Sequence, residues 1–418
     1  MRSLPYVFWV LFLPAFVSCA TPPRNIQPQI NSLVIAQHFD KAVSFLGQNP
    51  SAYGSNNELL FWLDRGFVLH LAGRYAESVS AFESAKRKFN DLYTRSISQT
   101  AATYAVNDYW QEYRGEDYEY VLVNIFQALN FAAMDNVSEA LVEARDMDAR
   151  SKWTKTDDAF ARMLFGILYR AAGTPQDLND AYIDDVRSKA QYGADVPKIL
   201  AQNLEAAQTP DVQASAEVYL FHYTGFVPLK VADTFLIPLD ASHVTAISFP
   251  RYADRVSDVR SSVFSAVGPA VGPAVGGAGS RSAQENTEPV EDIGAIAKKI
   301  LNDRKAFILA KAGLRPIGKY LLEKAVESRV RDRNGETPAE IVNLFANVYN
   351  LYSEQADVRG WQTLPEKIRA ARLLLEPGRY EFFVEDLDEK GVSLGKKPLG
   401  VFDLQAGRKK FFIVRSYR

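Results

Sequence analysis

The chain has 418 residues, of which 47% are hydrophobic and 23% are charged, a composition typical of globular domains with sizeable cores. Lys and Arg together number 48 and Asp and Glu 50, which leaves a formal charge of -2. A chain this close to neutrality has no overall field to attract nucleic acid, and we therefore expect no nucleic-acid partner.

The N-terminus has the features of a lipoprotein signal. Arg2 precedes an apolar run, residues 4–17, that is too short to span a bilayer. The run ends beside Cys19, the only cysteine of the chain, in a pattern similar to a bacterial lipobox with Phe16 where Leu is usual. We predict a signal peptide at residues 1–18, lipidation of Cys19 and a tether over residues 19–32; an unmodified cysteine behind a plain signal peptide is the alternative. Ala20 after the cysteine implies, for such lipoproteins, attachment to the periplasmic face of the outer membrane.

Residues 59–90 fit a tetratricopeptide (TPR) helix–turn–helix. Gly73 ends a first helix where a left-handed residue is favoured, and small residues alternate with large ones along both predicted helices. The positions that match the repeat are Trp62, Gly66, Leu69, Tyr75, Ser78, Phe82 and Ala85. An ordinary antiparallel helix hairpin is the alternative, but a TPR-like pair needs neighbours to cover its apolar flank.

Further helical patterns extend the predicted array over residues 33–208. A degenerate pair precedes Pro50, and two more pairs are expected over residues 121–147 and 158–192. This predicts a TPR-like α-solenoid of about four helix pairs.

After Thr209 the period of the apolar residues changes from helical to strand-like. Short runs rich in Val, Ile, Phe and Tyr recur at residues 216–222, 231–237, 244–249, 371–375, 378–385, 400–404 and 408–417. Helices are expected at residues 293–331 and 337–355, and a flexible Gly/Pro/Ala loop at residues 265–288. The expected fold class is α+β, with a solenoid followed by a mixed domain, residues 209–418, that holds a small β-sandwich-like sheet with inserted helices.

No motif for catalysis or cofactor binding is found in the sequence. The four histidines lie far apart without a second ligand at metal spacing, and phosphate-loop, dinucleotide and zinc-protease patterns are missing. We therefore expect no metal, no cofactor, no catalytic residues and no enzymatic activity. One competing hypothesis is a cell-wall hydrolase with Glu119 and Glu143 as acid and base.

Two aromatic stretches are candidates for binding a partner. The first runs from Trp110 to Tyr120 and mixes large rings with carboxylates, as interaction surfaces do. The second surrounds Trp361, which either faces a partner or wedges the helices against the sheet. For the first stretch the alternative is that its rings close the groove between repeats.

Several segments resemble one family, the uncharacterised TPR-like lipoproteins of Gram-negative bacteria. They are residues 118–130, 140–145, 180–184, 225–230, 249–252 and 359–365, and so span most of the chain. The resemblance implies work in the cell envelope, because such lipoproteins often occur beside activators of penicillin-binding proteins. The candidate partner-binding residues are Trp110, Tyr113, Tyr118, Glu119, Asn124, Arg145 and Trp361. The expected function is a non-enzymatic scaffold whose concave surface binds a protein or peptide in the periplasm, or alternatively a permanent subunit of an envelope complex.

Overall fold

The computed structural model describes residues 26–98, 111–154, 157–206, 215–238, 244–270, 280–309 and 355–417. The chain belongs to the mixed α+β class, as its sequence predicts. The predicted signal peptide, Cys19, Trp110 and nearly all of the helix expected at residues 337–355 lie outside the described residues.

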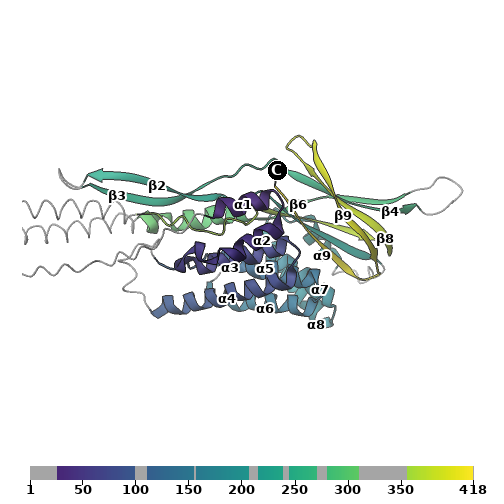
Figure 1. Ribbon diagram of the computed structural model, residues 1–418. Helices are drawn as coiled ribbons and strands as arrows, with labels where there is room; N and C mark the ends of the chain where they lie inside the picture. Colours follow the sequence, from purple (N-terminus) through teal and green to yellow (C-terminus); the bar gives the residue numbers. More distant parts are fainter. Residues whose placement is uncertain are drawn as a thin grey trace, which may run out of the picture.

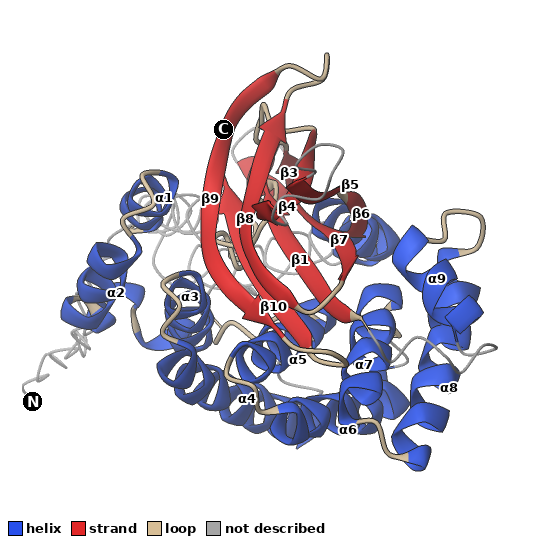
Figure 2. Cartoon of the chain, turned by 90° about the vertical axis from the view of Figure 1, so that its right-hand side faces the viewer, coloured by secondary structure: helices blue, strands red, loops and turns tan. Residues whose placement is uncertain are grey.

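Helices occupy the first half of the chain and follow one another along an arc (Figures 1 and 2). Within it, α3 packs on α4, α5 on α6 and α7 on α8. The helices are α1 (Gln27–Ile35), α2 (Phe39–Gln48), α3 (Glu58–Leu71), α4 (Tyr75–Ser98), α5 (Asp117–Ala133), α6 (Val137–Thr154), α7 (Ala159–Ala172), α8 (Pro175–Tyr192) and α9 (Lys198–Ala206). Short 3₁₀ turns, Pro50–Tyr53 and Ser55–Asn57, join α2 to α3, and residues 293–309 form a further helix.

The tight contact expected between α3 and α4 is confirmed at Gly66. A Cβ added to Gly66 would lie 2.5 Å from the nearest ring carbon of Phe82, so no larger side chain fits without displacing that ring. The Ser78 hydroxyl donates a hydrogen bond to the Gly66 carbonyl across the same contact, at 2.7 Å. Small residues at these positions therefore set the spacing of the two helices.

The described residues of the second half of the chain form three sheets (Figure 1). The first has the strand order β10-β1-β7-β6, the second β5-β4-β8-β9, and the third is the two-stranded ribbon β2-β3. The strands are β1 (Ala216–Thr224), β2 (Leu229–Pro238), β3 (Val244–Ala253), β4 (Ser261–Ala270), β5 (Ser280–Asn286), β6 (Glu288–Asp292), β7 (Lys367–Leu375), β8 (Gly378–Leu387), β9 (Ser393–Leu404) and β10 (Lys409–Ser416). β1 runs parallel to β10 and antiparallel to β7.

The sheet that contains β1 is buried on both faces, because alternate side chains of each strand enter different cores. From β1, Val218 and Leu220 pack against the second sheet, where Phe264 and Phe382 are also buried. The intervening residues, among them Phe221, pack against the helices. The order of layers is therefore helices, first sheet and second sheet (Figure 2), and helices and first sheet share one hydrophobic core.

The loop expected at residues 265–288 is largely strand, which corrects that prediction. Ala266 is fully buried between the sheets, and Val267 pairs with Ser282 of β5. The alternation of Phe264 and Ala266 continues the inward face of β4 into the Gly/Pro-rich stretch. The register shifts between Val267 and Ala270, and a bulge is a position where a strand tolerates a proline such as Pro269. Only residues 271–279 of this stretch lie outside the description.

Candidate functional site

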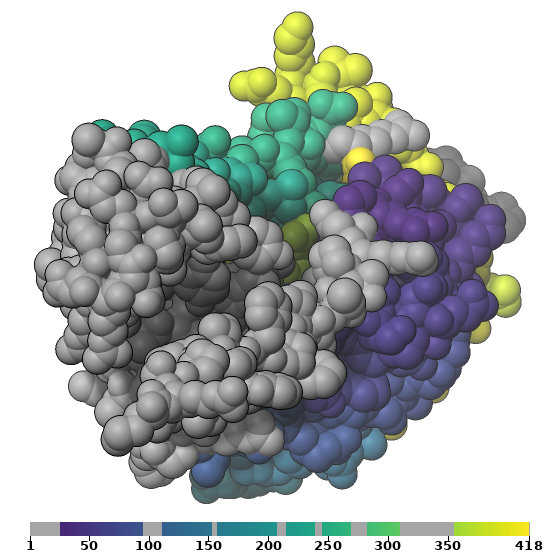
Figure 3. Space-filling model, turned by 60° about the vertical axis from the view of Figure 1, so that its left-hand side comes forward, coloured from purple at the N-terminus to yellow at the C-terminus, as the bar shows by residue number. Residues whose placement is uncertain are grey.

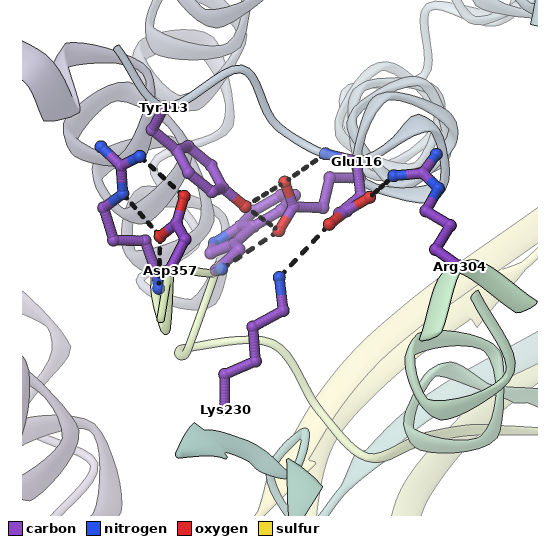
Figure 4. A network of polar contacts seen from close by, with 8 residues as sticks. Tyr113, Glu116, Lys230, Arg304 and Asp357 are labelled. Carbon is purple, nitrogen blue, oxygen red and sulfur yellow. Dashed lines mark hydrogen bonds and ion pairs between the residues drawn. The ribbon is translucent and has the colours of Figure 1, made fainter. Parts of the chain in front are cut away.

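Five of the seven predicted binding residues are buried, and three of them meet at the start of α5. Tyr113, Glu119 and Trp361 join a polar network with Glu116, Lys230, Arg304, Asp357 and Arg359 (Figure 4). The network connects α5, strand β2, the helix at residues 293–309 and the segment 355–366, which precedes β7. It therefore joins the helices of the first half of the chain to segments of the second half.

The local sequence explains why α5 begins at this point. Gly115 has φ +73°, a left-handed conformation, and a Cβ there would come within 2.2 Å of the Phe89 ring. Glu116 follows as the N-cap, and its N–H donates to Glu119 Oε2 at 3.0 Å. In a capping box, the side chain at the third helical position accepts a hydrogen bond from the N-cap N–H. Glu119 makes this bond, so its side chain lies beside the N-terminus of α5.

Glu119 is fully buried and collects several donors. The Tyr113 hydroxyl lies 2.8 Å from both carboxylate oxygens, and the backbone N–H of Trp361 donates to Oε1 at 3.1 Å. Burial opposes the charge, as does the neighbouring carboxylate of Glu116, and together they raise the pKa of Glu119 from 4.5 to about 7 although the donors favour ionisation. Near neutral pH, Glu119 therefore exists as a mixture of the acid and the carboxylate.

Glu116 connects this helix end to the second half of the chain. Its Oε1 accepts from Lys230 Nζ of β2 at 3.2 Å, and its Oε2 accepts from Arg304 at 2.7 Å. Lys230 is itself mostly buried, and the Glu116 charge raises its pKa despite the opposing effect of desolvation. The ribbon β2-β3 and the helix at residues 293–309 are thus both attached to α5 by charge.

Trp361 fills the inner face of the helical arc. Its ring is 2% exposed and meets Phe67, Phe82 and Phe126 nearly edge-on, with ring centroids 5.9, 6.0 and 5.9 Å away. Its Nε1–H donates to the Thr363 hydroxyl at 3.0 Å. Of the two alternatives for Trp361, the structure shows the buried one, in which the ring packs among α3, α4 and α5.

A second buried carboxylate holds the same segment from the other side. Asp64 of α3 accepts from the Thr363 hydroxyl at 2.7 Å and from the Tyr53 hydroxyl at 2.6 Å. Arg415 of β10 then donates to the Thr363 carbonyl at 2.7 Å. Segment 355–366 is therefore fixed to two helices and to the first sheet.

The predicted exposed patch is not formed. Tyr113, Tyr118, Glu119 and Asn124 are buried, because α5 begins at Asp117 and nearly every side chain of this helix faces the core. Aromatic closure, the alternative for this stretch, describes the packing. Arg145 on α6 is exposed and stands apart from these residues, and Trp110 is outside the description.

The two carboxylates of the hydrolase hypothesis belong to different networks. Glu143 of α6 pairs with Lys86 of α4 and accepts from Gln127 Nε2 at 3.2 Å. Burial raises its pKa to about 7, an effect that the Lys86 charge opposes. Among the described contacts, Glu119 and Glu143 share no hydrogen-bonding partner.

The sequence analysis missed Asp64, Thr363 and Arg415, which complete the site. A signal existed for Thr363 alone, since it lies inside the stretch around Trp361. His70 is buried as well and bonds to Asn130 and Tyr223, at 2.6 and 2.9 Å, and burial lowers its pKa to about 4. Across the described ranges no cluster of three or more His, Cys, Asp or Glu side chains has the arrangement of a metal site.

No protein-family model matches the chain, and neither the curated proteins nor the solved structures give a significant match. Among the helices that the structure describes, none combines the length and the apolar character needed to cross a bilayer.

Proposed function

We propose that the chain is a lipoprotein of the TPR-like family named above, anchored through Cys19 to the outer membrane, and that it acts in the periplasm as a non-enzymatic scaffold for a protein or peptide partner in envelope maintenance or assembly. In this proposal α3 to α8 form the TPR-like array. The tight contact at Gly66 supports that assignment, as does Gly173 at the end of α7 with φ +76°.

The proposal differs in one respect from the expectation drawn from the sequence. A TPR-like array commonly binds its partner on the concave face. Here that face carries Trp361 and packs against Tyr223 of β1, so the chain itself occupies it. We therefore place partner binding on the outer surface.

The observation that carries the proposal is an exposed apolar stretch on the ribbon β2-β3. Phe235, Leu236 and Ile237 are 57%, 65% and 37% exposed, and they follow one another directly. Large apolar side chains exposed together at one end of a strand, on a protein in water, favour an interaction surface there. The polar networks, in contrast, are buried and bound to the chain's own groups, which favours a structural role for them over catalysis.

Affinity capture tests this function. Envelopes are crosslinked, the tagged protein is purified, and the captured proteins are identified by mass spectrometry. A specific partner that dissociates without crosslinking supports a scaffold, whereas a subunit that copurifies without crosslinker favours the permanent-subunit alternative. Cleavage of peptidoglycan by the pure protein would favour the hydrolase and contradict the proposal.

A further inference from the structure

Among the strands that the structure describes, β3 alone pairs with β2. The two strands pair along their whole length, from Leu229 opposite Ala253 to Pro238 opposite Val244. In an antiparallel pair, alternate residues direct both their N–H and C=O away from the partner strand, so the outer edge of β2 offers a row of donors and acceptors.

The apolar residues of β2 lie on both faces of this edge strand. Successive side chains of a strand point to opposite faces, so Phe235 and Ile237 share one face and Leu236 lies on the other. Their exposure is specific to β2, because the residues paired with Leu236 and Ile237, Ala246 and Thr245 of β3, are each 2% exposed. Figure 3 shows the ribbon, in teal, at the surface of the molecule.

The inner half of the ribbon holds the outer half in place. Lys230 is bound to Glu116, and its Nζ lies 6.0 Å from the centroid of the Tyr252 ring, which is opposite Lys230 in β3. Further out, Arg251 donates to Asp233 at 2.8 Å across the two strands. The edge is therefore preformed, and a ligand does not have to order it.

The open edge indicates what kind of molecule covers these residues. A lipid bilayer would accept the side chains, but the unpaired N–H and C=O groups would lose their water without gaining partners, which costs several kcal/mol for each group. A second copy of the chain could pair with the edge through its own β2, and the sedimentation measurement below tests that occupant. An added strand satisfies both the side chains and the backbone.

We propose that an extended segment of another protein adds to β2 as a third strand, in the manner of β-augmentation. This inference rests on the proposed scaffold function and names the surface and chemistry of the partner. Since both faces of the edge are apolar at residues 235–237, the segment carries several consecutive apolar residues rather than an alternating pattern. It has no proline at the paired positions, because proline lacks the N–H that the edge requires.

A peptide probe tests the proposal on the full chain with Cys19→Ser, which avoids the lipid. The probe is a fluorescently labelled peptide, Lys-Lys-Val-Ile-Phe-Val-Lys, and its binding is followed by fluorescence anisotropy. A second peptide of the same sequence carries N-methyl groups on all four central residues, so that neither of its edges can pair. The proposal predicts saturable binding of the parent peptide and loss of binding for the methylated peptide. Equal binding of the two would overturn it, because backbone pairing would then play no part.

Matched variants locate the site. Phe235→Ser with Leu236→Ser is expected to weaken binding about tenfold or more, since it removes apolar side chains that the added strand would bury. Val256→Ser is the control, because Val256 is 90% exposed and lies outside the ribbon. Equal binding by the double variant and the control would refute the assignment to β2, as would no binding of any peptide at about 1 mM.

Two more measurements separate the other occupants. Flotation with phosphatidylethanolamine–phosphatidylglycerol vesicles that depends on Phe235 would assign the edge to lipid. A concentration-dependent dimer in sedimentation velocity that Leu236→Lys abolishes would assign it to a second copy. Either result would overturn strand addition. A failure of this kind would leave capture of a partner from envelopes unaffected, so the scaffold function can survive while its binding surface is found to be elsewhere.

Discussion

Replacing Glu119 by glutamine changes how the stability of the chain depends on pH. Glu119 is fully buried, and its pKa is raised from 4.5 to about 7. When an acid has a higher pKa in the folded state than in the unfolded state, its contribution to stability is complete below the unfolded pKa. That contribution is lost as the pH rises through the folded pKa. The loss for Glu119 therefore falls between about pH 4.5 and about pH 7.

The size of the effect follows from the pKa change. One pKa unit corresponds to about 1.4 kcal/mol, so a rise from 4.5 to about 7 makes the wild type about 3 kcal/mol less stable at about pH 8 than it would be with a neutral group. The glutamine side chain of the Glu119→Gln variant carries no charge, but its amide cannot accept from both the Glu116 and the Trp361 N–H groups. That mismatch costs about 1–3 kcal/mol at all pH values.

Urea unfolding of both proteins from about pH 5 to about pH 8 measures the difference. We expect Glu119→Gln to have a lower free energy of unfolding than the wild type at about pH 5. Between about pH 5 and about pH 8 the wild type loses stability and the variant does not, so the difference in unfolding free energy shifts by about 3 kcal/mol in favour of the variant. The other buried acids, such as Glu143, act equally in both proteins and cancel. A gap for Glu119→Gln that is independent of pH would refute the reasoning.

Three further predictions concern packing and anchoring. Trp361→Ala is expected to lower the free energy of unfolding by about 3–5 kcal/mol, because the ring fills the space between Phe67, Phe82 and Phe126. A loss below about 1 kcal/mol, measured by urea unfolding, would mean that the segment around Trp361 is not a structural wedge. Gly66→Ala is expected to lower the free energy of unfolding by about 1–3 kcal/mol, because the added Cβ displaces the Phe82 ring. Gly360→Ala is the matched control, since a Cβ there meets nothing within 4 Å. Equal melting temperatures for the two variants would contradict the tight α3–α4 contact. Cys19→Ser is expected to release the protein into the soluble periplasmic fraction, since acyl chains on this residue supply the anchor; membrane association of the variant in fractionated cells would show that another element anchors it.

The sequence predicted the local elements because their signals are short in range. The runs at residues 216–222 and 231–237 lie within β1 and β2, and the pair predicted over residues 59–90 contains α3 and the start of α4. Such patterns depend on the alternation or the helical spacing of apolar residues, which the backbone geometry imposes directly. The strands β4 and β5 were predicted as a loop, because the Gly and Pro content of residues 268–279 outweighed the strand-like alternation of apolar side chains that precedes it.

The candidate site was predicted less well, for a reason that concerns contacts between distant parts of the chain. The sequence near Glu119 is rich in aromatic and acidic residues, a composition that exposed binding patches and buried networks share. Whether these side chains are buried depends on their contacts with Trp361 and Lys230, which are more than a hundred residues away along the chain. No local pattern shows that segment 355–366 enters the inner face of the helices. The apolar stretch of β2 was read correctly as a strand, but its exposure depends on which strands pair with it.

Site-specific photocrosslinking in intact cells tests the central claim most directly, namely that a partner binds the outer surface at β2. A photoreactive p-benzoylphenylalanine replaces Phe235 or Val256, one at a time, and the products are identified by mass spectrometry after irradiation. The account predicts a discrete crosslinked partner from position 235, in which the partner is attached through an apolar segment, and none from exposed position 256. A partner crosslinked from neither position, or equally from both, would contradict it, because β2 would then not be the binding surface.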